Sequence, residues 1–306
     1  MNKWLSGLGC GWLLLLAGLL LLSACGREER DYQPEFSAQP LRDAGHYSFA
    51  IHPLHNPERL LEVYGPLIDY LNRHIKGAHF VLEASRNYEE FDKKLYAAQP
   101  DFALPNPYQT LNSLKHGYRV FGKMGDDHNF RGILLVRRDA GIRAVADLKG
   151  RKVSYPAKTA LAATMMPQYY LHTHGLDINR DIENLYVGSQ ESSIMNVYLG
   201  QVAAAATWPV PWLAFQREHP DKAAQLELKW QTEPLVNNGL VARNDIPPEL
   251  VEQVAGLLAT LHESSEGRAM LARLPISRFE RANDASYDVV RVFLDEFSRT
   301  MRPLEP

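Results

Sequence analysis

Short apolar strands alternate with amphipathic helices along most of this chain, and this alternation constrains the fold more than any other feature. The segment from Tyr47 to Ile51 is rich in β-forming residues, and a helix with apolar residues at helical spacing begins at Pro57. Strand-like segments at 79–83 and 101–104 are each followed by a further helical pattern. The order β-α-β-α-β-α with short connections predicts a parallel sheet with right-handed crossovers.

The same alternation recurs in the second half of the chain. Strands are predicted at 132–136, 152–155, 183–187 and 202–206, with helices after the last three. A strand at 235–242 would return the chain to the first unit, ahead of helices near 248–262, 265–274 and 286–301. We therefore expect an α/β fold of two lobes, joined by two crossing strands near residues 132 and 238, with a ligand cleft between the lobes.

The N-terminus reads as a secretory signal. A basic start is followed by an apolar run, Gly11–Leu22, and then by Leu-Ser-Ala-Cys, which resembles the bacterial lipobox with Cys25 as the lipidated residue. A transmembrane anchor is the alternative, but the run is shorter than the ~20 residues that a spanning helix needs. Gly26 after the cysteine, in place of Asp, suggests sorting to the outer membrane of a Gram-negative host.

These features predict a protein on the periplasmic face of a bacterial membrane, lipid-anchored at Cys25. The expected divisions are a signal peptide at 1–24, a tether at 25–44, a first lobe at 45–131 and 240–306, and a second lobe at 132–239.

The cysteine count excludes several kinds of site. Of the two cysteines, Cys10 leaves with the signal and Cys25 carries lipid, so neither a disulfide nor a cysteine nucleophile or metal ligand is expected in the lobes. The formal net charge is −3 and no run of basic residues occurs, so no nucleic-acid partner is expected.

Several stretches, in order and spacing, resemble one family: the phosphate/phosphite/phosphonate-binding periplasmic proteins of ABC transporters. The stretches are Tyr64–Leu71 (YGPLIDYL), Asp101–Ala103 followed by Pro107-Tyr108, Asp147–Ser154 (DLKGRKVS), and Gly188–Gln190 followed by Val197 and Gly200–Val202. The resemblance covers residues 47–300. It implies a type II-like, two-lobed periplasmic binding protein that closes on a small anionic or polar solute for a membrane ABC permease, without a cofactor.

The chain departs from this family at three pocket positions. The helix start that carries hydroxyls in the family reads PAKTALAA at 156–163, the family histidine is Gln190, and the family acidic residue is Ala203. A phosphonate dianion needs several donors, since an unpaired buried charge costs several kcal/mol. Lys158, Thr159, Gln190 and helix N–H groups remain as donors, so the identity of the ligand stays open.

Candidate ligand contacts in the first unit follow its strands. His52 and His55 lie after the first strand, and Asn106 and Tyr108 lie after the third, where Tyr108 matches a family pocket position. The alternative for Tyr108 is a core tyrosine. The two histidines have the spacing of a metal pair, but no third ligand is visible, so no metal site is predicted. Tyr88 is expected to be structural.

Candidate contacts in the second unit lie at helix starts, where N–H groups attract anions. Lys158 and Thr159 open one helix, and Ser189 and Gln190 open the next, although each hydroxyl is also a plausible N-cap.

Three further candidates follow the last strands. Thr207 and Trp208 end the strand at 202–206; Trp208 is assigned to the cleft and Trp212 to the core. Asn237 lies on the return crossing, where the alternative is a tight Asn-Gly turn.

Three classes of function fit this pattern to different degrees. The leading one is a solute-binding protein for an ABC transporter, and the second is a sensor subunit that uses the same clamp to regulate a membrane histidine kinase. An enzyme is disfavoured, since no G-x-S-x-G motif, no H-E-x-x-H motif and no usable cysteine are present.

Overall fold

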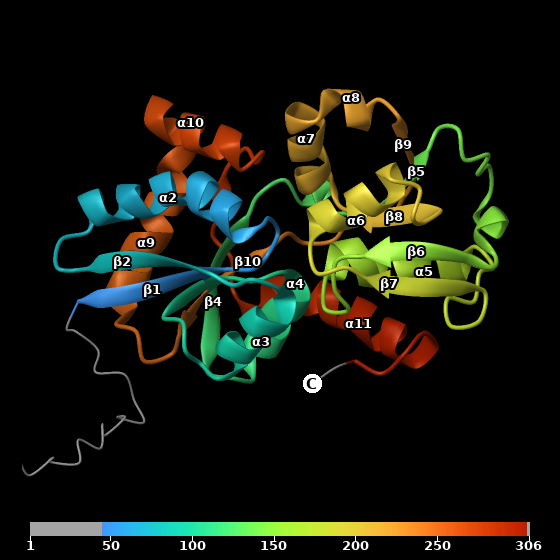
Figure 1. The fold of residues 1–306 in the computed structure, drawn as a ribbon. Coiled ribbons are helices and arrows are strands. Elements are labelled where there is room, and N and C mark those ends of the chain that lie inside the picture. Colours follow the sequence, from blue (N-terminus) through green and yellow to red (C-terminus); the bar gives the residue numbers. More distant parts are fainter. Residues whose placement is uncertain (1–44, 305–306) are drawn as a thin grey trace, which may run out of the picture. The chain divides into compact units, whose positions relative to one another are not determined.

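A six-stranded mixed sheet organises one half of the folded body, which we call the six-stranded half (Figure 1). The computed structural model describes residues 45–304. The strand order is β11-β4-β10-β3-β1-β2. The strands are β1 (His46–Ile51), β2 (His79–Ala84), β3 (Phe102–Leu104), β4 (Tyr118–Met124), β10 (Gly239–Arg243) and β11 (Phe279–Glu280). The signal, Cys25 and the tether lie outside the described residues.

Three of these strands form the expected parallel unit. β1 pairs in parallel with β2 on one side and with β3 on the other, with Phe49 opposite Phe102. β10 then pairs antiparallel with both β3 and β4, and β11 pairs antiparallel with β4. The antiparallel strands make the sheet mixed, whereas the sequence order predicts a parallel one.

Alternating side chains of β1 and β3 face two separate cores. Phe49 and Ile51 pack into an apolar cluster with residues of α2, α9 and α10, whereas Ala50 packs into the cluster that holds residues of α3 and α4. The helices of this half are α2 (Pro57–His74), α3 (Tyr88–Tyr96), α4 (Pro107–Leu114), α9 (Pro248–Thr260), α10 (Ser265–Arg273) and α11 (Asp288–Thr300). Both faces of the sheet are therefore covered, as parallel strands require.

The helix α2 shows how the sequence sets its own boundaries. Asn56 caps the helix by accepting a hydrogen bond from Arg59 N, and Pro57 occupies the first turn. Its buried side chains recur on one face at helical spacing. That face packs on β2 and β1, and the chain turns back into β2 after Gly77, whose φ of 78° suits glycine.

A five-stranded sheet of order β7-β6-β8-β5-β9 organises the other half, called the five-stranded half. β6 is parallel to β7 and β8, while β5 is antiparallel to β8 and β9. The strands are β5 (Ile133–Arg137), β6 (Arg151–Tyr155), β7 (Ile182–Tyr186), β8 (Ala204–Thr207) and β9 (Leu226–Gln231). The helices are α5 (Met166–Thr173), α6 (Gln190–Tyr198), α7 (Pro209–Glu218) and α8 (Pro220–Ala223), with a π-helical turn at Leu161–Met165 directly before α5.

Two short segments carry the chain between the halves. Residues 125–132 lead from β4 to β5, and residues 232–238 lead from β9 back to β10. The segments run side by side, because Leu235 N donates to Phe130 O at 2.9 Å and Thr232 N donates to Gly132 O at 2.9 Å. The return strand predicted at 235–242 starts only at Gly239, so the crossing itself has no regular secondary structure.

Two strands next to the crossings are absent from the sequence prediction. Each pairs with a strand of its own half that lies about 90 residues or more away in the chain, β4 with β10 and β9 with β5. Both are long-range antiparallel pairs, and neither strand takes part in the β-α-β order that the pattern analysis detects.

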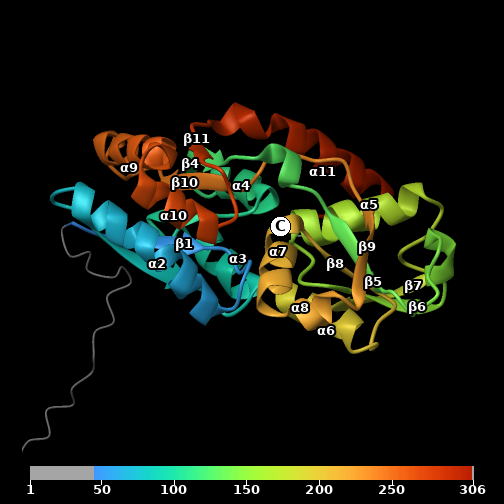
Figure 2. The same ribbon diagram turned by 90° about the horizontal axis from the view of Figure 1, so that it is seen from above.

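The last helix, α11, contacts both halves. It packs against α4 of the six-stranded half and lies beside α5 of the five-stranded half (Figure 2). The rings of Phe293 in α11 and Tyr169 in α5 have centroids 5.6 Å apart. Beyond its end, Arg302 Nη2 donates to Lys158 O at 2.8 Å. Among residues 45–304, no helix is both long and apolar enough to cross a membrane.

Candidate functional site

A small cavity lies where the two halves meet. Its volume is about 10 Å³, close to the space that one water molecule occupies. Both halves and both crossing segments contribute to its wall. The lining residues are His52, Tyr88, Asn106, Phe130, Ala160, Leu161, Ala162, Ala163, Gln190, Trp208 and Asn238.

The topology explains why these residues meet. His52 follows β1 and Asn106 follows β3, while Gln190 follows β7 and Trp208 follows β8. The carboxyl ends of parallel strands share one edge of a sheet, and ligands of open α/β folds bind at that edge. Here the carboxyl edges of two sheets face the same cavity.

One wall of the cavity is a helix start. The carbonyl of Ala160 accepts both Thr164 N and Met165 N, so the N–H groups of Leu161, Ala162 and Ala163 precede the first intrahelical bond. The turn is π-helical and continues into α5. Unpaired N–H groups at a helix start attract negative charge, so this wall is suited to an anion.

Gln190 joins the two halves at the cavity wall. Its Nε2 donates to the hydroxyl of Tyr88 at 3.1 Å, and its Oε1 accepts from Thr207 Oγ1 at 2.8 Å. Burial raises the pKa of Tyr88 above its ordinary value, so the phenol stays protonated. Since its oxygen already accepts from Gln190, the Tyr88 O–H remains as a donor.

His52 is neutral at physiological pH and presents an acceptor. Burial lowers the pKa of His52 to about 4. Its Nδ1 lies 2.8 Å from Leu104 O, which can only accept, so Nδ1 carries the proton. Nε2 is then the unprotonated nitrogen. With His52 neutral, none of the lining side chains carries a formal charge.

Two further hydrogen bonds cross between the halves beside the cavity. Asn106 Nδ2 donates to Thr159 O at 3.0 Å, and Thr159 Oγ1 donates to Asp92 Oδ2 at 3.0 Å. Asp92 also accepts from Gln109 Nε2 at 2.6 Å. Thr159 is thus engaged in holding the halves together rather than lining the cavity.

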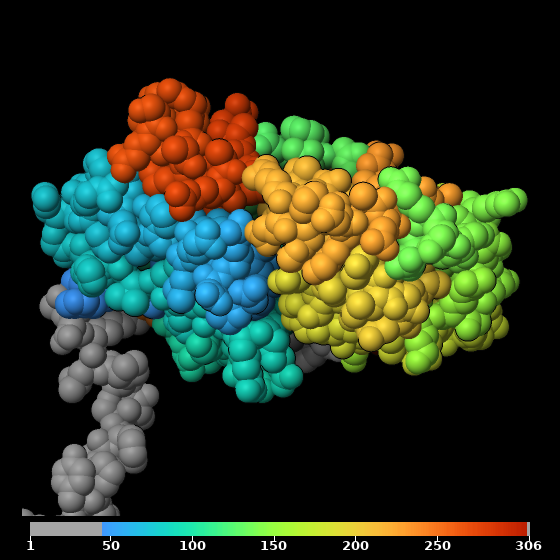
Figure 3. All heavy atoms as spheres, turned by 45° about the horizontal axis from the view of Figure 1, so that its top comes forward, coloured from blue at the N-terminus to red at the C-terminus, as the bar shows by residue number. Residues whose placement is uncertain are grey.

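Two surface grooves flank the same seam. One, of about 300 Å³, is lined by the start of α2 and by α6 and α7, and it contains His55. Arg59 of α2 pairs with Glu218 of α7 across it at 2.9 Å, where Figure 3 shows the blue atoms of α2 against the gold atoms of α7. The other, of about 640 Å³, is lined by α3 and by residues 156–159.

The remaining candidates from the sequence fall outside the cavity wall. His55 lies in the first groove, and burial together with Arg59 lowers its pKa to about 3. Lys158 lies in the second groove, exposed, with its ammonium 5.9 Å from the centre of the Tyr186 ring. Ser189 is the N-cap of α6 and accepts from Ser192 N.

Three other candidates are buried supports. Tyr108 lies in the core beneath α4, since Asn106 caps that helix and Pro107 starts it, which turns residue 108 inward. Thr207 reaches the site only through Gln190. Asn237 has both amide atoms engaged, with Nδ2 donating to Gly125 O and Oδ1 accepting from Asn238 N.

Of the sequence candidates, the cavity therefore brings together His52, Asn106, Gln190 and Trp208. It adds Tyr88 and Phe130, which were not candidates, and Asn238, the neighbour of the candidate Asn237. Tyr88 is expected to be structural from sequence, yet it lies in the wall. The Asn-Gly pair marks the return crossing, but only the fold distinguishes Asn238, in the wall, from Asn237, beside it. Within residues 45–304, no group of three His, Cys, Asp or Glu side chains is placed to hold a metal ion.

The sequence of this chain is similar to that of a known binding protein. A curated relative, the probable ABC transporter phosphite binding protein PhnD1 of Prochlorococcus marinus (strain MIT 9301), is 24% identical over 146 residues, which is 45% of this chain. The match spans about half of that relative, 48% of its length.

Two solved structures share the fold over most of the chain. A binding protein component of an ABC phosphonate transporter from Pseudomonas aeruginosa superposes with a TM-score of 0.77 at 18% identity, over 84% of this chain and 88% of that one. PhnD1 from Prochlorococcus marinus (MIT 9301), in complex with methylphosphonate, gives 0.76 at 16% identity, over 84% and 98%. The fold is therefore that of a two-lobed periplasmic binding protein.

The family profile described as "ABC transporter, phosphonate, periplasmic substrate-binding protein" matches residues 49–287. Since that match spans most of the chain, the protein belongs to this family of periplasmic substrate-binding proteins of ABC transporters, whose members are binding proteins and not enzymes.

Proposed function

We propose that this protein is a lipid-anchored solute-binding protein that closes on a small oxyanion of the phosphonate, phosphite or phosphate class and delivers it to an ABC permease. Its lobes would be residues 45–131 with 240–306, and residues 132–239. The observation that carries the proposal is that the helix start at Leu161–Ala163, whose N–H groups precede the first intrahelical bond, lines a cavity built by both halves.

The size of the cavity supports a small solute. Pockets for drug-sized ligands have volumes of roughly 300–1,000 Å³, whereas this cavity measures about 10 Å³. A tetrahedral oxyanion is larger than one water molecule, so the walls must lie somewhat farther apart around it. Opening and closing about residues 125–132 and 232–238 would provide that adjustment.

The absence of charge in the wall favours an anion held by dipoles. Among residues 45–304, no Lys or Arg lines the cavity, so binding would rely on helix N–H groups, Tyr88 and the amides of Asn106 and Gln190. Backbone donors at a helix start bind oxyanions without a charged partner. We propose the cavity residues His52, Asn106, Gln190 and Trp208 as ligand contacts, with Thr159 and Thr207 as their supports.

Isothermal titration calorimetry tests the proposal. The chain 25–306 with Cys25→Ser is titrated with methylphosphonate, phosphite, phosphate, methanesulfonate and glutamate. We expect saturable binding of at least one phosphorus oxyanion with a stoichiometry of one. Binding of glutamate alone would contradict it.

A charge variant tests the sign of the ligand. Gln190→Glu keeps the acceptor for Thr207 but places a negative charge in the cavity wall. We expect the affinity for the oxyanion to fall by more than about tenfold, because like charges in a site of low dielectric repel by several kcal/mol. Gln216→Glu makes the same change at an exposed position of α7 and should leave binding unchanged. A gain in affinity with Gln190→Glu would indicate a cationic ligand instead.

Two experiments address the anchor and the partner. Mass spectrometry of the full-length protein from membranes should find a diacylglyceryl group on Cys25, and Cys25→Ala should release the protein into the soluble periplasm. Deletion of the cognate permease should abolish uptake of the bound solute. If uptake is unaffected while a histidine-kinase response is lost with this protein, the sensor function replaces the transport function.

A further inference from the structure

Asn238 has a buried polar atom that the protein itself leaves without a partner. The residue is fully buried in the cavity wall, and its Oδ1 accepts no hydrogen bond from the described residues. Its other polar groups are engaged: N donates to Asn237 Oδ1 at 2.8 Å, O accepts from Met124 N at 2.8 Å, and Nδ2 donates to Met124 Sδ at 3.3 Å. Because the thioether can only accept, the amide orientation is defined and Oδ1 remains as an acceptor.

A second acceptor lines the same small space. His52 gives its Nδ1 proton to Leu104 O, which leaves Nε2 with a lone pair. The cavity therefore combines donors, from the helix start and Tyr88, with acceptors, from Asn238 and His52. A buried acceptor without a donor costs roughly as much as a lost hydrogen bond, so a ligand that supplies a proton is favoured.

We propose that this cavity selects a singly protonated phosphorus oxyanion, whose unprotonated oxygens meet the N–H groups of Leu161–Ala163 and whose O–H donates to Asn238 Oδ1. The proposal rests on the proposed function and specifies the ionic form of its ligand. Phosphorus oxyanions lose their second proton near neutral pH, so the form with one O–H is available in the periplasm.

The wall disfavours the three closest competitors. A dianion would set its oxygens against the lone pair of Asn238 Oδ1 and would need a compensating cation, which the wall lacks. A sulfonate carries one charge but no O–H, so Oδ1 would stay unpaired. An ammonium group would find no carboxylate in the wall to balance its charge.

Calorimetry on the chain 25–306 with Cys25→Ser tests this without any change in the cavity. Methylphosphonate and methanesulfonate have nearly the same shape, and at pH 6 only the former carries an O–H. We expect methylphosphonate to bind at least about tenfold more tightly, as a hydrogen bond to a charged group predicts. From pH 6 to pH 9 its affinity should decline, by tenfold per pH unit above its second pKa.

The neighbouring protein groups do not reproduce this pH dependence. The groups that face Asn238 and the cavity are His52, Tyr88, Tyr287, Asp92, Asp127 and Lys123. His52 has a pKa of about 4, and burial raises the pKa of both tyrosines. Asp127 and Lys123 pair at 2.8 Å. Methanesulfonate does not ionise in this range, so its titration at each pH reports any contribution of the protein.

A matched pair of variants assigns the effect to one atom. Asn238→Leu removes the acceptor at similar size and should weaken methylphosphonate about tenfold or more while changing methanesulfonate less than twofold. Asn196→Leu, on the outer part of α6 where Nδ2 donates to Ser192 O, should change neither. Thermal melting checks that both variants fold. If Asn238→Leu does not fold, the comparison of methylphosphonate with methanesulfonate on the protein with an unchanged cavity tests the proposal.

The outcomes are distinct. Tighter binding of methylphosphonate that weakens with pH supports the proposal. Equal affinity for the two ligands, or affinity for methylphosphonate that rises with pH, overturns it and leaves the proposed function intact. Binding of neither ligand, nor of phosphite or phosphate, overturns both.

Discussion

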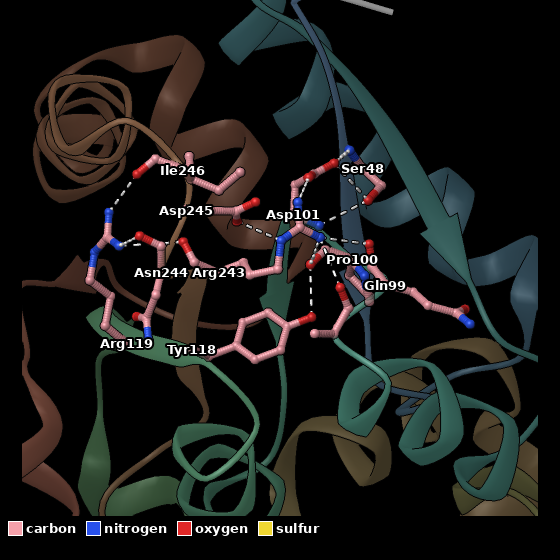
Figure 4. Close-up of polar contacts among 11 residues, drawn as sticks. Ser48, Gln99, Pro100, Asp101, Tyr118, Arg119, Arg243, Asn244, Asp245 and Ile246 are labelled. Atoms are coloured by element: carbon pink, nitrogen blue, oxygen red, sulfur yellow. Dashed lines mark hydrogen bonds and ion pairs between the residues drawn. The ribbon is translucent and has the colours of Figure 1, made fainter. Parts of the chain in front are cut away.

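Arg243, the last residue of β10, occupies a buried ionic network with residues at the start of β3 (Figure 4). Its Nη2 lies 2.5 Å from Asp101 Oδ1 and its Nε lies 2.6 Å from Asp245 Oδ1. Its Nη1 donates to the carbonyls of Ala98 and Gln99 at 2.9 and 3.0 Å. Asp101 Oδ2 in turn accepts from Ser48 N at 2.8 Å. One guanidinium thus joins the end of β10 to the starts of β3 and β1.

Arg243→Met removes the charge and keeps much of the apolar stem. Arg243 and Asp101 are each only 7% exposed, so the variant leaves a buried carboxylate without its cation. Removing one partner of a buried pair costs about 3–5 kcal/mol. At roughly 2–4 °C per kcal/mol for a chain of this size, the melting temperature should fall by about 6–20 °C.

Urea denaturation followed by circular dichroism measures the loss in free energy of unfolding, and thermal melting measures the fall in melting temperature. Because the network lies at the opposite ends of the strands from the cavity, ligand affinity at 20 °C should change less than twofold. The double variant Arg243→Met/Asp101→Leu should recover part of the loss, since the buried carboxylate of Asp101 is then gone and only the exposed carboxylate of Asp245 loses its cation. A loss below about 1 kcal/mol, or equal losses in the single and double variants, would refute the reasoning.

Three further predictions concern the seam between the halves and pH. Asp92→Ala removes the acceptor of the Thr159 hydroxyl, so closure of the two halves should weaken. Calorimetry should show the Kd for the ligand rise about fivefold, which corresponds to the ~1 kcal/mol of one hydrogen bond. An unchanged Kd would show that this contact does not support closure. Arg59→Gln breaks the exposed pair with Glu218, and its Kd should stay within about twofold at all salt concentrations; a larger, salt-dependent loss would make the pair a principal clasp. Because the folded pKa of His52, about 4, lies below the unfolded value of 6.5, the unfolded state binds the proton first, so His52 should lower the stability by about 3 kcal/mol as pH falls from 6.5 to 4. In urea titrations His52→Gln should remove this part of the decline and leave the part that comes from His55, whose pKa is also lowered.

The sequence predicted the local elements well because their signals are local. The helix predicted to begin at Pro57 does begin there, and its apolar spacing matches the buried face of α2. The strands β4 and β9 were not predicted because they pair with strands more than 80 residues away in the chain, so no neighbouring turn marks them.

The candidate site was predicted by position more than by residue. The ends of β1, β3, β7 and β8 supply four of the cavity residues, as the carboxyl-edge rule expects. Tyr108 failed to reach the cavity because the capping box at Asn106 rotates it into the core. Tyr88 was missed because its hydroxyl faces the other half, a contact with Gln190 over 102 residues that no local pattern encodes.

By itself, the sequence determined the α/β alternation, the two units, the two crossings and the family, since these follow from periodicity, caps and motif order within short windows. Only the tertiary structure decided which polar atoms face the cavity. The Thr159 hydroxyl donates to Asp92, and the Asn237 amide donates to Gly125 O. Asn238 Oδ1 accepts no hydrogen bond from the described residues. The physical reason is that a hydrogen bond is either used within the fold or left for a ligand, and that choice depends on partners brought together from distant parts of the chain.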